Sequence, residues 1–517
     1  MWTRTCALPR QPPPTPPNKR TLQTKRKSPD GNQAVWKAGQ IRYNGHLGNG
    51  VAIFMGYIVG EDREQASLLP SRIADYVASD AAVRVIDAFA DGLDLAGLGF
   101  VRAAPASTGR PGYDPRDLLK LYVWGYFNEV RSSRRLERSC RRDVEAMWLM
   151  RRLAPDFKTI ADFRRDNGPA IVGACRAFVL VCRDAGLFAA RLVALDGSKF
   201  RAAASPKKVI GRREIAEEQA RLDNRIATYL SGLDEADANE ADDEPGAFPA
   251  ALAVLRARRA ELDRMAGKLE TQERNTLVEG EEDARPMRGG SGQKPPCYNV
   301  QTAVDTDTGL IVHHEVTDEA TDRRQLHPMA SATKESLDLD TLTVVADKGF
   351  DNGEHASACE RDGIVACVPS QRSINNQGDG TLFDRTAFAY DPATDTLACP
   401  AGRTLVRKQL HRKKRNVTYV SQDCSGCALK PSCTTAERRT VKRHLDDDAL
   451  NRMDARATPE MMKARRCAVE HPFGTIKRMT AGGRFLTRNL KGTRTEMALS
   501  VLAYNILRAI NIRTAAA

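Results

Sequence analysis

The sequence predicts a mixed α/β protein in which an all-helical N-terminal region precedes an α/β domain that two inserts interrupt. Helical patterns follow one another over residues 60–186, and strand-like runs alternate with helical patterns over residues 190–510. Residues 211–284 and 371–457 differ in composition from the segments around them. Strands that alternate with helices build a sheet covered by helices. A chain of 517 residues has room for roughly two to four structural units.

The N-terminal region carries its own helix-start signals. Asp114 followed by Pro115 predicts the start of one helix, and Asp143 and Thr159 are expected to cap two more. Short helices with tight connections and many arginines fit a DNA-binding module of the helix-turn-helix kind. They fit a plain helical bundle with a charged surface equally well, so spacing alone leaves both interpretations open.

The charge of the chain predicts a polyanionic partner. The sequence has 79 Lys and Arg against 66 Asp and Glu, which gives a formal charge of +13 and a pI near 9.2. Such an excess is typical of proteins that bind nucleic acid. Because the sequence has neither a run of about 18 apolar residues nor a signal-peptide pattern, we expect a cytosolic protein without a membrane partner.

Residues 1–54 are predicted to form a disordered tail. They are rich in Pro, Lys and Arg and lack apolar periodicity, so they cannot build a core. Ordinary globular sequence begins soon after Met55. Two interpretations stand: translation begins at or near Met55, or the tail is a basic arm that helps to hold DNA.

Residues 190–510 predict a particular order of elements. The apolar run in RLVALDGSKF ends at Asp196 and Gly197, as a buried strand ends at a loop. CYNVQTAVDT and LIVHHEVTD flank a turn-like sequence and predict a hairpin. A helix over residues 322–337, a strand ending at Asp347, another helix and a last strand follow. The expected order is strand, hairpin, helix, strand, helix, strand.

The two inserts have different characters. Residues 211–284 are charged, with leucines at roughly helical spacing, and predict two long helices at about 211–232 and 248–277. These helices should pair as a hairpin or a short coiled coil. Residues 371–457 are polar and contain CPAG and CSGCALKPSC.

The cysteines of the second insert have the spacing of a metal site. Cys399, Cys424, Cys427 and Cys433 could complete a tetrahedral structural Zn²⁺ site, with CPAG and CSGC as its two knuckles. Reduced structural cysteines, or a partial site, are the alternatives. Other cysteines, including Cys140, Cys175 and Cys467, lack a pairing pattern and are expected to be buried as small apolar residues.

Three acids stand out by their positions. Asp196 and Asp347 each end a predicted strand, and Glu470 lies on a predicted helix after the sheet. Ligands tend to sit at strand C-termini in α/β sheets, and hard cations such as Mg²⁺ take oxygen ligands. Two such ions about 4 Å apart can drive an in-line displacement at phosphorus. Taken singly, each aspartate could equally be a turn residue or a helix cap.

The stretch RRCAVEHPFGTIKR surrounds Glu470 with cations. On a helix, the offsets from Arg466 to Glu470 and on to Lys477 leave all three within about 60° of one another. One face would then present cation, carboxylate, cation. Pro472 is expected to kink that helix. The alternative is a solvated face with ordinary charge pairs four residues apart.

Several blocks of the sequence resemble a known family. LDGSKF, VADKGFDNGEH and EHPFGTIKR are similar to the three catalytic blocks of bacterial insertion-sequence transposases of the DDE class. GRPGYDP, LLKLYVWGYFNEVRSSRRLER and PDFKTIADFRRDN resemble the N-terminal domain of one branch of that family. The resemblance covers residues 60–510 or thereabouts. It implies an RNase H-like catalytic core, divalent metal, and cleavage and joining of DNA strands.

The resemblance also implies roles for individual residues. Asp196, Asp347 and Glu470 would hold two Mg²⁺ or Mn²⁺ ions. The cations expected near DNA phosphates are Arg466 and Lys477, with Lys199, Arg201 and Lys348 as further candidates that could equally be solvated. The helical region would bind the terminal inverted repeats, and synapsis would bring a homodimer onto the target DNA. Such an enzyme would work in the bacterial cytoplasm, at the nucleoid.

One motif departs from the family pattern. The related signature spaces Tyr, Arg, Glu and Lys along one helix, and Lys463 stands at the Tyr position here. A phosphate or stacking contact made by that Tyr is therefore in doubt, whereas the proposed metal ligands are retained. Two other functions stay open: an RNase H-like nuclease that cuts without joining, and an inactive DNA-binding relic.

Overall fold

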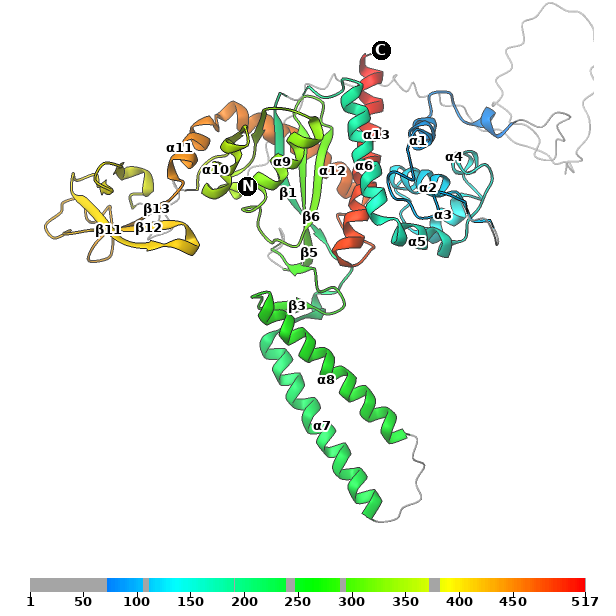
Figure 1. The fold of residues 1–517 in the computed structure, drawn as a ribbon, viewed down its shortest axis with the longest axis horizontal. Helices are drawn as coiled ribbons and strands as arrows, with labels where there is room; N and C mark the ends of the chain where they lie inside the picture. Colours follow the sequence, from blue (N-terminus) through cyan, green and yellow to red (C-terminus); the bar gives the residue numbers. More distant parts are fainter. Residues whose placement is uncertain are drawn as a thin grey trace, which may run out of the picture. The chain divides into compact units, whose positions relative to one another are not determined.

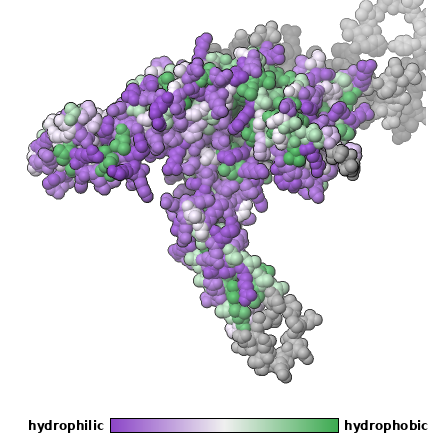
Figure 2. All heavy atoms as spheres, viewed as in Figure 1, coloured by the Kyte–Doolittle hydropathy of each residue, from purple (hydrophilic) through white to green (hydrophobic). Residues whose placement is uncertain are grey.

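A computed structural model describes residues 72–105, 111–189, 191–238, 247–288, 294–371 and 382–516. These residues belong to one compact unit, Arg72–Ala517, and the predicted tail at 1–54 lies outside the described residues. No helix in the described part of the chain combines the length and the apolar character needed to cross a membrane. Figure 2 shows hydrophilic residues over most of the face that it presents.

The N-terminal region is helical, as the sequence predicts. Asp114 and Asp143 cap their helices by accepting the amides of Arg116 and Ala146. The cap predicted at Thr159 is wrong, because the Asp156 carboxylate accepts two amides there and caps that helix three residues earlier. The helices of this region are α1 (Ala82–Asp91), α2 (Pro115–Phe127), α3 (Ser133–Ser139), α4 (Val144–Leu149), α5 (Phe157–Asp166) and α6 (Gly168–Asp184).

The main sheet is mixed. Its strands are β1 (Val193–Arg201), β4 (Arg285–Pro286), β5 (Pro296–Asp305), β6 (Ile311–Thr317), β7 (Leu342–Val345) and β8 (Ile364–Cys367). They run in the order β4-β5-β1-β7-β8, with β6 paired to β5. The hairpin of β5 and β6 is antiparallel, as predicted, and β1 joins it antiparallel to β5. On the other side β1 pairs in parallel with β7, and β7 with β8.

Helices cover both faces of this sheet (Figure 1). On one face Leu195 of β1 packs in a cluster with α9 (Leu326–Leu337), α10 (Gly353–Arg361) and α11 (Asp447–Arg456). On the other face Ala194 packs against Ala468 and Val469 of α12 (Pro459–Met479). Because neighbouring residues of a strand point to opposite faces, Asp196 lies on the same face as Ala194 and α12.

The long C-terminal helix joins the N-terminal helices to the sheet. This helix, α13 (Asn489–Ala516), contacts α2, α6 and β6. Its Glu496 is fully buried and accepts a hydrogen bond of 2.9 Å from Arg131, which lies between α2 and α3. The same carboxylate accepts the amides of Leu486 and Thr487. One buried acid therefore ties three segments together.

The first insert contains two helices that lie side by side (Figure 1). They are α7 (Arg212–Ala238) and α8 (Ala247–Thr271), and Ile215, Leu222, Leu262 and Leu269 are among the buried residues between them. The second helix ends before the predicted residue 277, because Thr276–Val278 instead form strand β3. This strand pairs with β2 (Val209–Gly211) at the base of the hairpin.

The second insert contains an antiparallel sheet of its own, which was not predicted from its polar, cysteine-bearing sequence. Its strands are β9 (Ala389–Asp391), β10 (Thr396–Ala398), β11 (Thr404–His411), β12 (Asn416–Ser421) and β13 (Thr440–His444), in the order β13-β12-β11-β10-β9. The apolar core beneath them is small, with Phe388, Leu397, Leu405, Val417, Tyr419 and Val441 as its buried members.

Candidate active site

Asp196 lies within strand β1. The parallel pairing of β1 with β7 covers only Val193 and Ala194, whereas its antiparallel pairing with β5 continues to Arg201. The prediction that the strand ends at Asp196 and Gly197 is therefore wrong, because the ladder with β5 carries it further. Asp196 instead marks the place where β1 loses its parallel neighbour, and its side chain is 20 % exposed.

Asp347 follows β7 directly, at the strand end that the sequence predicts. Its carboxylate caps a short 3-10 turn over Lys348–Phe350 by accepting the amide of Gly349 at 2.7 Å. Because β1 and β7 are parallel neighbours, Asp196 and Asp347 reach the same edge of the sheet. Two carboxylates from adjacent strands thus face one space.

Arg465 of α12 bridges these two aspartates. One of its terminal nitrogens donates to Oδ1 of Asp196 and lies 3.3 Å from Oδ2 of Asp347. The Arg465 side chain is 12 % exposed. Burial raises the pKa of Asp196 to about 6, while the Arg465 guanidinium opposes that shift and nearby Asp347 adds to it. The two acids are therefore close enough to share one counter-ion.

Glu470 stays outside this cluster. It is exposed, and within the described ranges it makes no hydrogen bond or ion pair. The buried side chains of α12, which run from Ala468 to Met479, define the face that packs on the sheet. At about 100° per residue, Arg465 lies about 10° from the middle of that face and Glu470 about 130° from it. The helix therefore presents Arg465 to the aspartates.

The predicted flanking cations of Glu470 differ from one another. Helix α12 continues through Pro472, which is buried, so Arg466, Glu470 and Lys477 share one helix as predicted. Arg466 is exposed, and so is Lys463 at the Tyr position of the family signature. The ammonium of Lys477 lies 5.8 Å from the ring centroid of Phe200, a cation–π distance. Lys477 is therefore held against the core, whereas Arg466 is open to solvent.

The remaining cations that were predicted to contact phosphates also differ in their exposure and pairing. Lys348 and Arg201 are exposed. Lys199 instead lies 3.5 Å from the Asp322 carboxylate, and burial lowers the pKa of this lysine. Its charge is thus already matched by an acid of the same chain.

Asp322 is a residue of this region that sequence reasoning missed. It lies in the loop before α9, within a stretch predicted to be helical from residue 322. Its Oδ1 accepts hydrogen bonds from Asn299 at 2.7 Å and Gln301 at 2.6 Å, both fully buried on β5. A Cβ on Gly197 would collide with this carboxylate, so the glycine after Asp196 makes room for it. Two amides inside a core strand were the available sequence signal.

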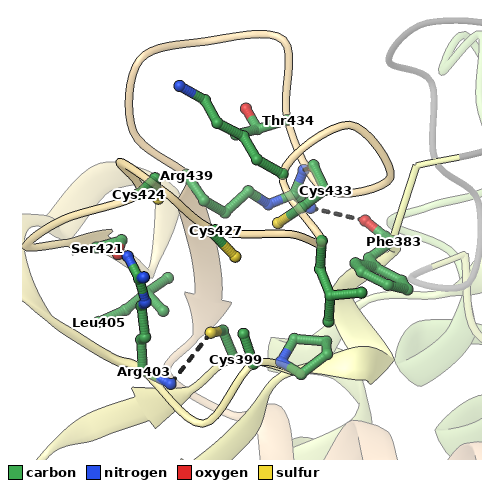
Figure 3. Close-up of a pocket in the computed structure, with 14 residues that line it drawn as sticks. Phe383, Cys399, Arg403, Leu405, Ser421, Cys424, Cys427, Cys433, Thr434 and Arg439 are labelled. Atoms are coloured by element: carbon green, nitrogen blue, oxygen red, sulfur yellow. Dashed lines mark hydrogen bonds between the residues drawn. The ribbon is translucent and has the colours of Figure 1, made fainter.

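The four predicted zinc ligands line one pocket (Figure 3). CPAG forms a tight turn in which the Gly402 amide donates to the Cys399 carbonyl at 2.8 Å, and Gly402 has a φ of +74°. The Arg403 amide donates to Cys399 Sγ at 3.3 Å. Burial raises the pKa of the Cys433 thiol, and the nearness of the other three thiols contributes to the shift.

The other cysteines only partly follow the expectation. Cys140 and Cys175 are buried, as predicted. Cys467 is exposed, so its predicted burial is wrong, because α12 turns this position away from the sheet.

The chemistry of the aspartate pair fits a hard cation. Carboxylate oxygens at a partly open edge are the donors that Mg²⁺ and Mn²⁺ prefer, with room left for water or phosphate. No three His, Cys, Asp or Glu side chains of the described residues are grouped so that they could hold a metal ion, and this finding applies to the thiols as well as the acids. A complete metal site, whether at the two aspartates or at the four thiols, would therefore require at least one further side chain to move into place.

Comparisons with known proteins identify the family. Residues 71–166 match the family model described as Transposase domain (DUF772), and residues 268–506 match that of the Transposase DDE domain. The first match covers the helices up to α5, and the second includes Asp347 and Glu470 but begins after Asp196. The comparisons with curated proteins and with solved structures found no match. Since both family models are of transposases and together span more than half of the chain, the protein belongs to the insertion-sequence transposases of the DDE class.

Proposed function

We propose that this transposase cuts DNA at the ends of an insertion sequence and joins the freed 3′-OH to target DNA. The observation that carries the proposal is the meeting of Asp196 and Asp347 at one edge of the sheet, close enough to share Arg465. Phosphoryl transfer needs positioning and charge neutralisation more than covalent help from the protein. An edge with two acids and open solvent access is suited to that task.

We propose that the main sheet is an RNase H-like core. In support, an antiparallel hairpin lies on one side of β1 and two parallel strands lie on the other. The two inserts, residues 211–284 and 371–457, enter this core between its elements, and the helical region of residues 60–186 precedes it.

Asp196, Asp347 and Glu470 are the proposed ligands of two Mg²⁺ or Mn²⁺ ions. Such ions would activate the attacking oxygen and stabilise the leaving one in an in-line displacement. The two aspartates are fixed by β1 and by the turn after β7. Glu470 would join them when Arg465 gives up its place, because α12 presents Arg465 to the aspartates in this structure.

Transposases bind DNA, and we propose where this one does so. Arg466, Arg201 and Lys348 are exposed cations on α12, on β1 and in the turn after β7, the elements that carry the three proposed ligands, and would contact phosphates directly. Lys477 would take part from its place over Phe200, and Lys199 only after release from Asp322. Helices α1 to α6 would bind the terminal inverted repeats, and a homodimer would pair two ends on the target DNA. The bacterial cytoplasm, at the nucleoid, is the proposed place of action.

A strand-transfer assay tests this function. The purified protein with Mg²⁺ should cut a duplex that carries the element's end and should join a pre-cut end to a target. Asp196→Asn and Asp347→Asn should abolish both steps while duplex binding persists. Asp340→Asn, an exposed acid before β7, is the matched control. Cleavage without a joined product would favour the nuclease, and binding without either step would favour the relic.

We also propose that Cys399, Cys424, Cys427 and Cys433 hold a structural Zn²⁺. The common pocket and the tight turn of CPAG support this. A structural metal ion would also stabilise a sheet whose apolar core is so small. The thiol side chains would have to rotate towards one point. Metal analysis should find about one zinc per chain. The double variant Cys424→Ser/Cys427→Ser should lose it, and Cys467→Ser should keep it. Zinc-free wild-type protein would overturn the proposal.

A further inference from the structure

The hairpin of β11 and β12 concentrates positive charge without acids of its own. Residues 404–421 include six Lys and Arg and no Asp or Glu. The six are Arg407, Lys408, Arg412, Lys413, Lys414 and Arg415. A run of cations is usually only a solvated surface. The contacts of each cation decide whether this run could instead be a binding surface.

The turn at the tip of this hairpin displays three of these cations. His411 pairs with Asn416 at the end of the ladder, and Arg412–Lys414 form a 3-10 turn between them. Arg412, Lys413 and Lys414 are exposed, and within the described part of the chain their side chains form no hydrogen bond or ion pair. Three like charges on consecutive residues repel one another, and the turn holds no acid to offset them.

The fourth cation of the turn fixes it in place. The backbone of Arg415 adopts the left-handed conformation. Its guanidinium donates hydrogen bonds from Nε and Nη2 to Oδ2 of Asp446, at 3.1 and 2.8 Å. The Leu445 amide also donates to the Arg415 carbonyl at 2.9 Å. Bidentate pairs of this kind give directional support. The turn is therefore an anchored element with three unpaired cations.

The same anchor connects the turn to the candidate active site. Asp446 accepts a hydrogen bond of 3.1 Å from Ser357 of α10. Helix α10 begins at Gly353, which follows the turn capped by Asp347. A Cβ on Gly353 would collide with the His444 ring at the end of β13, so the two segments are in close contact. The basic turn is thus connected to the helix that follows Asp347, one of the proposed metal ligands.

A bulge directs one further cation outwards. The pairing of β11 with β12 shifts between Arg407 and Gln409, which leaves Lys408 as the extra residue. A bulge re-aims the side chain that it inserts. Lys408 is exposed without an ion pair in the described residues, whereas Arg407 is paired to Asp395 at 3.1 Å. The hairpin thus has four unpaired cations, three at its tip and one on its strand.

We propose that the β11–β12 hairpin is a DNA-contact element whose basic turn, connected through Asp446 to the helix that follows Asp347, binds the phosphate backbone. A polyanion is the partner that relieves the repulsion among unmatched cations, and the release of counter-ions from DNA drives such contacts. The proposal rests on the proposed function only in that DNA is the partner. It adds a surface outside the residues expected to hold phosphates.

Salt-dependent DNA binding tests the proposal. The test protein is the full chain with Arg412, Lys413 and Lys414 replaced by Ala, and the probe is a duplex followed by fluorescence anisotropy over a range of KCl. Each lost phosphate contact lowers the slope of log K against log salt by about 0.9. We expect the slope to fall by about 2 to 3, and affinity near 0.1 M salt to fall by about tenfold or more.

A matched control separates local contact from net charge. The control removes the same number of positive charges from exposed sites on α7 and α8, namely Arg221, Arg225 and Arg256. Its slope should stay close to that of the wild type. An unchanged slope in the turn variant, or an equal fall in the control, would overturn the proposal. Because binding is measured, the result stands whether or not the protein cuts DNA, and unchanged thermal melting would show that both variants fold.

Discussion

Replacing Arg465 by Met should tighten the binding of Mg²⁺ or Mn²⁺ to the DNA-free protein. The Arg465 guanidinium contacts the same two carboxylates, Asp196 and Asp347, that would hold the cation. A metal ion must therefore displace a resident positive charge before it can bind. Met has a similar length and no charge, so Arg465→Met removes the competitor and keeps much of the packing.

The structure limits the size of this effect. A hydrogen bond to a charged group contributes about 1.5–3 kcal/mol. The contact to Asp347 is long, at 3.3 Å, and that carboxylate is 44 % exposed, so water screens it. We take about 2 kcal/mol for the two contacts together, which corresponds to roughly thirtyfold tighter metal binding. Without metal, the variant should lose about 1–2 kcal/mol of stability, because two neighbouring acids then lack their counter-ion.

Titration calorimetry with Mn²⁺ on the DNA-free protein measures the affinity. Thermal denaturation with and without metal measures the change in stability. Arg466→Met is the matched control, since the neighbouring Arg466 is exposed and its loss changes the net charge equally. If the Arg465 variant bound metal no more tightly than this control, the guanidinium would not stand in the place of the cation, and the reasoning would fail.

Three other predictions follow from the fold. Glu496→Ala should cost about 3–5 kcal/mol in urea denaturation, because it leaves a buried arginine without its partner; a loss below about 1 kcal/mol would contradict this. Gly197→Ala should destabilise the protein by about 1–3 kcal/mol and slow DNA cleavage, because the new Cβ collides with Asp322, and normal cleavage would refute the clash. Loss of hydration lowers the pKa of His313 to about 4 and of His314 to about 3. Unfolded histidines bind protons below about pH 6.5, so stability should fall as pH drops through that range towards 4. Denaturation of the variant with both replaced by Gln should show a flatter profile, and an unchanged profile would exclude these groups.

The sequence predicts the main sheet well because its signals are local. Apolar runs, a turn and the strand-ending Asp347 lie within short stretches, and the predicted element order matches the structure. The extent of β1 is different. Its continuation from Gly197 to Arg201 depends on pairing with β5, about 100 residues away, and no pattern within the strand reports that partner.

The candidate site shows the same limit at a helix. Helical periodicity places Arg466, Glu470 and Lys477 on one side of α12, but it does not state which side meets the sheet. The apolar stripe contains that information, since Arg465 lies at its centre. A cation in the middle of a buried stripe requires a partner, and this was the signal that could have revealed the bridge to the aspartates.

This placement of Arg465 constrains how Glu470 could reach the metal ligands. Turning α12 by about 130° would expose Val469, Phe473 and Ile476, which are buried against the sheet and the core. Exposing each such side chain costs about 1.5–3 kcal/mol, a total comparable to the stability of a whole domain. Rotation of the helix would therefore cost too much free energy to bring Glu470 to the aspartates. To join the aspartates as proposed, Glu470 would have to approach by a small shift or a local change near Gly474 while Arg465 leaves. The departing guanidinium would then need a new anion. A DNA phosphate at the edge of the sheet supplies one, so substrate binding and assembly of the acidic cluster would favour each other.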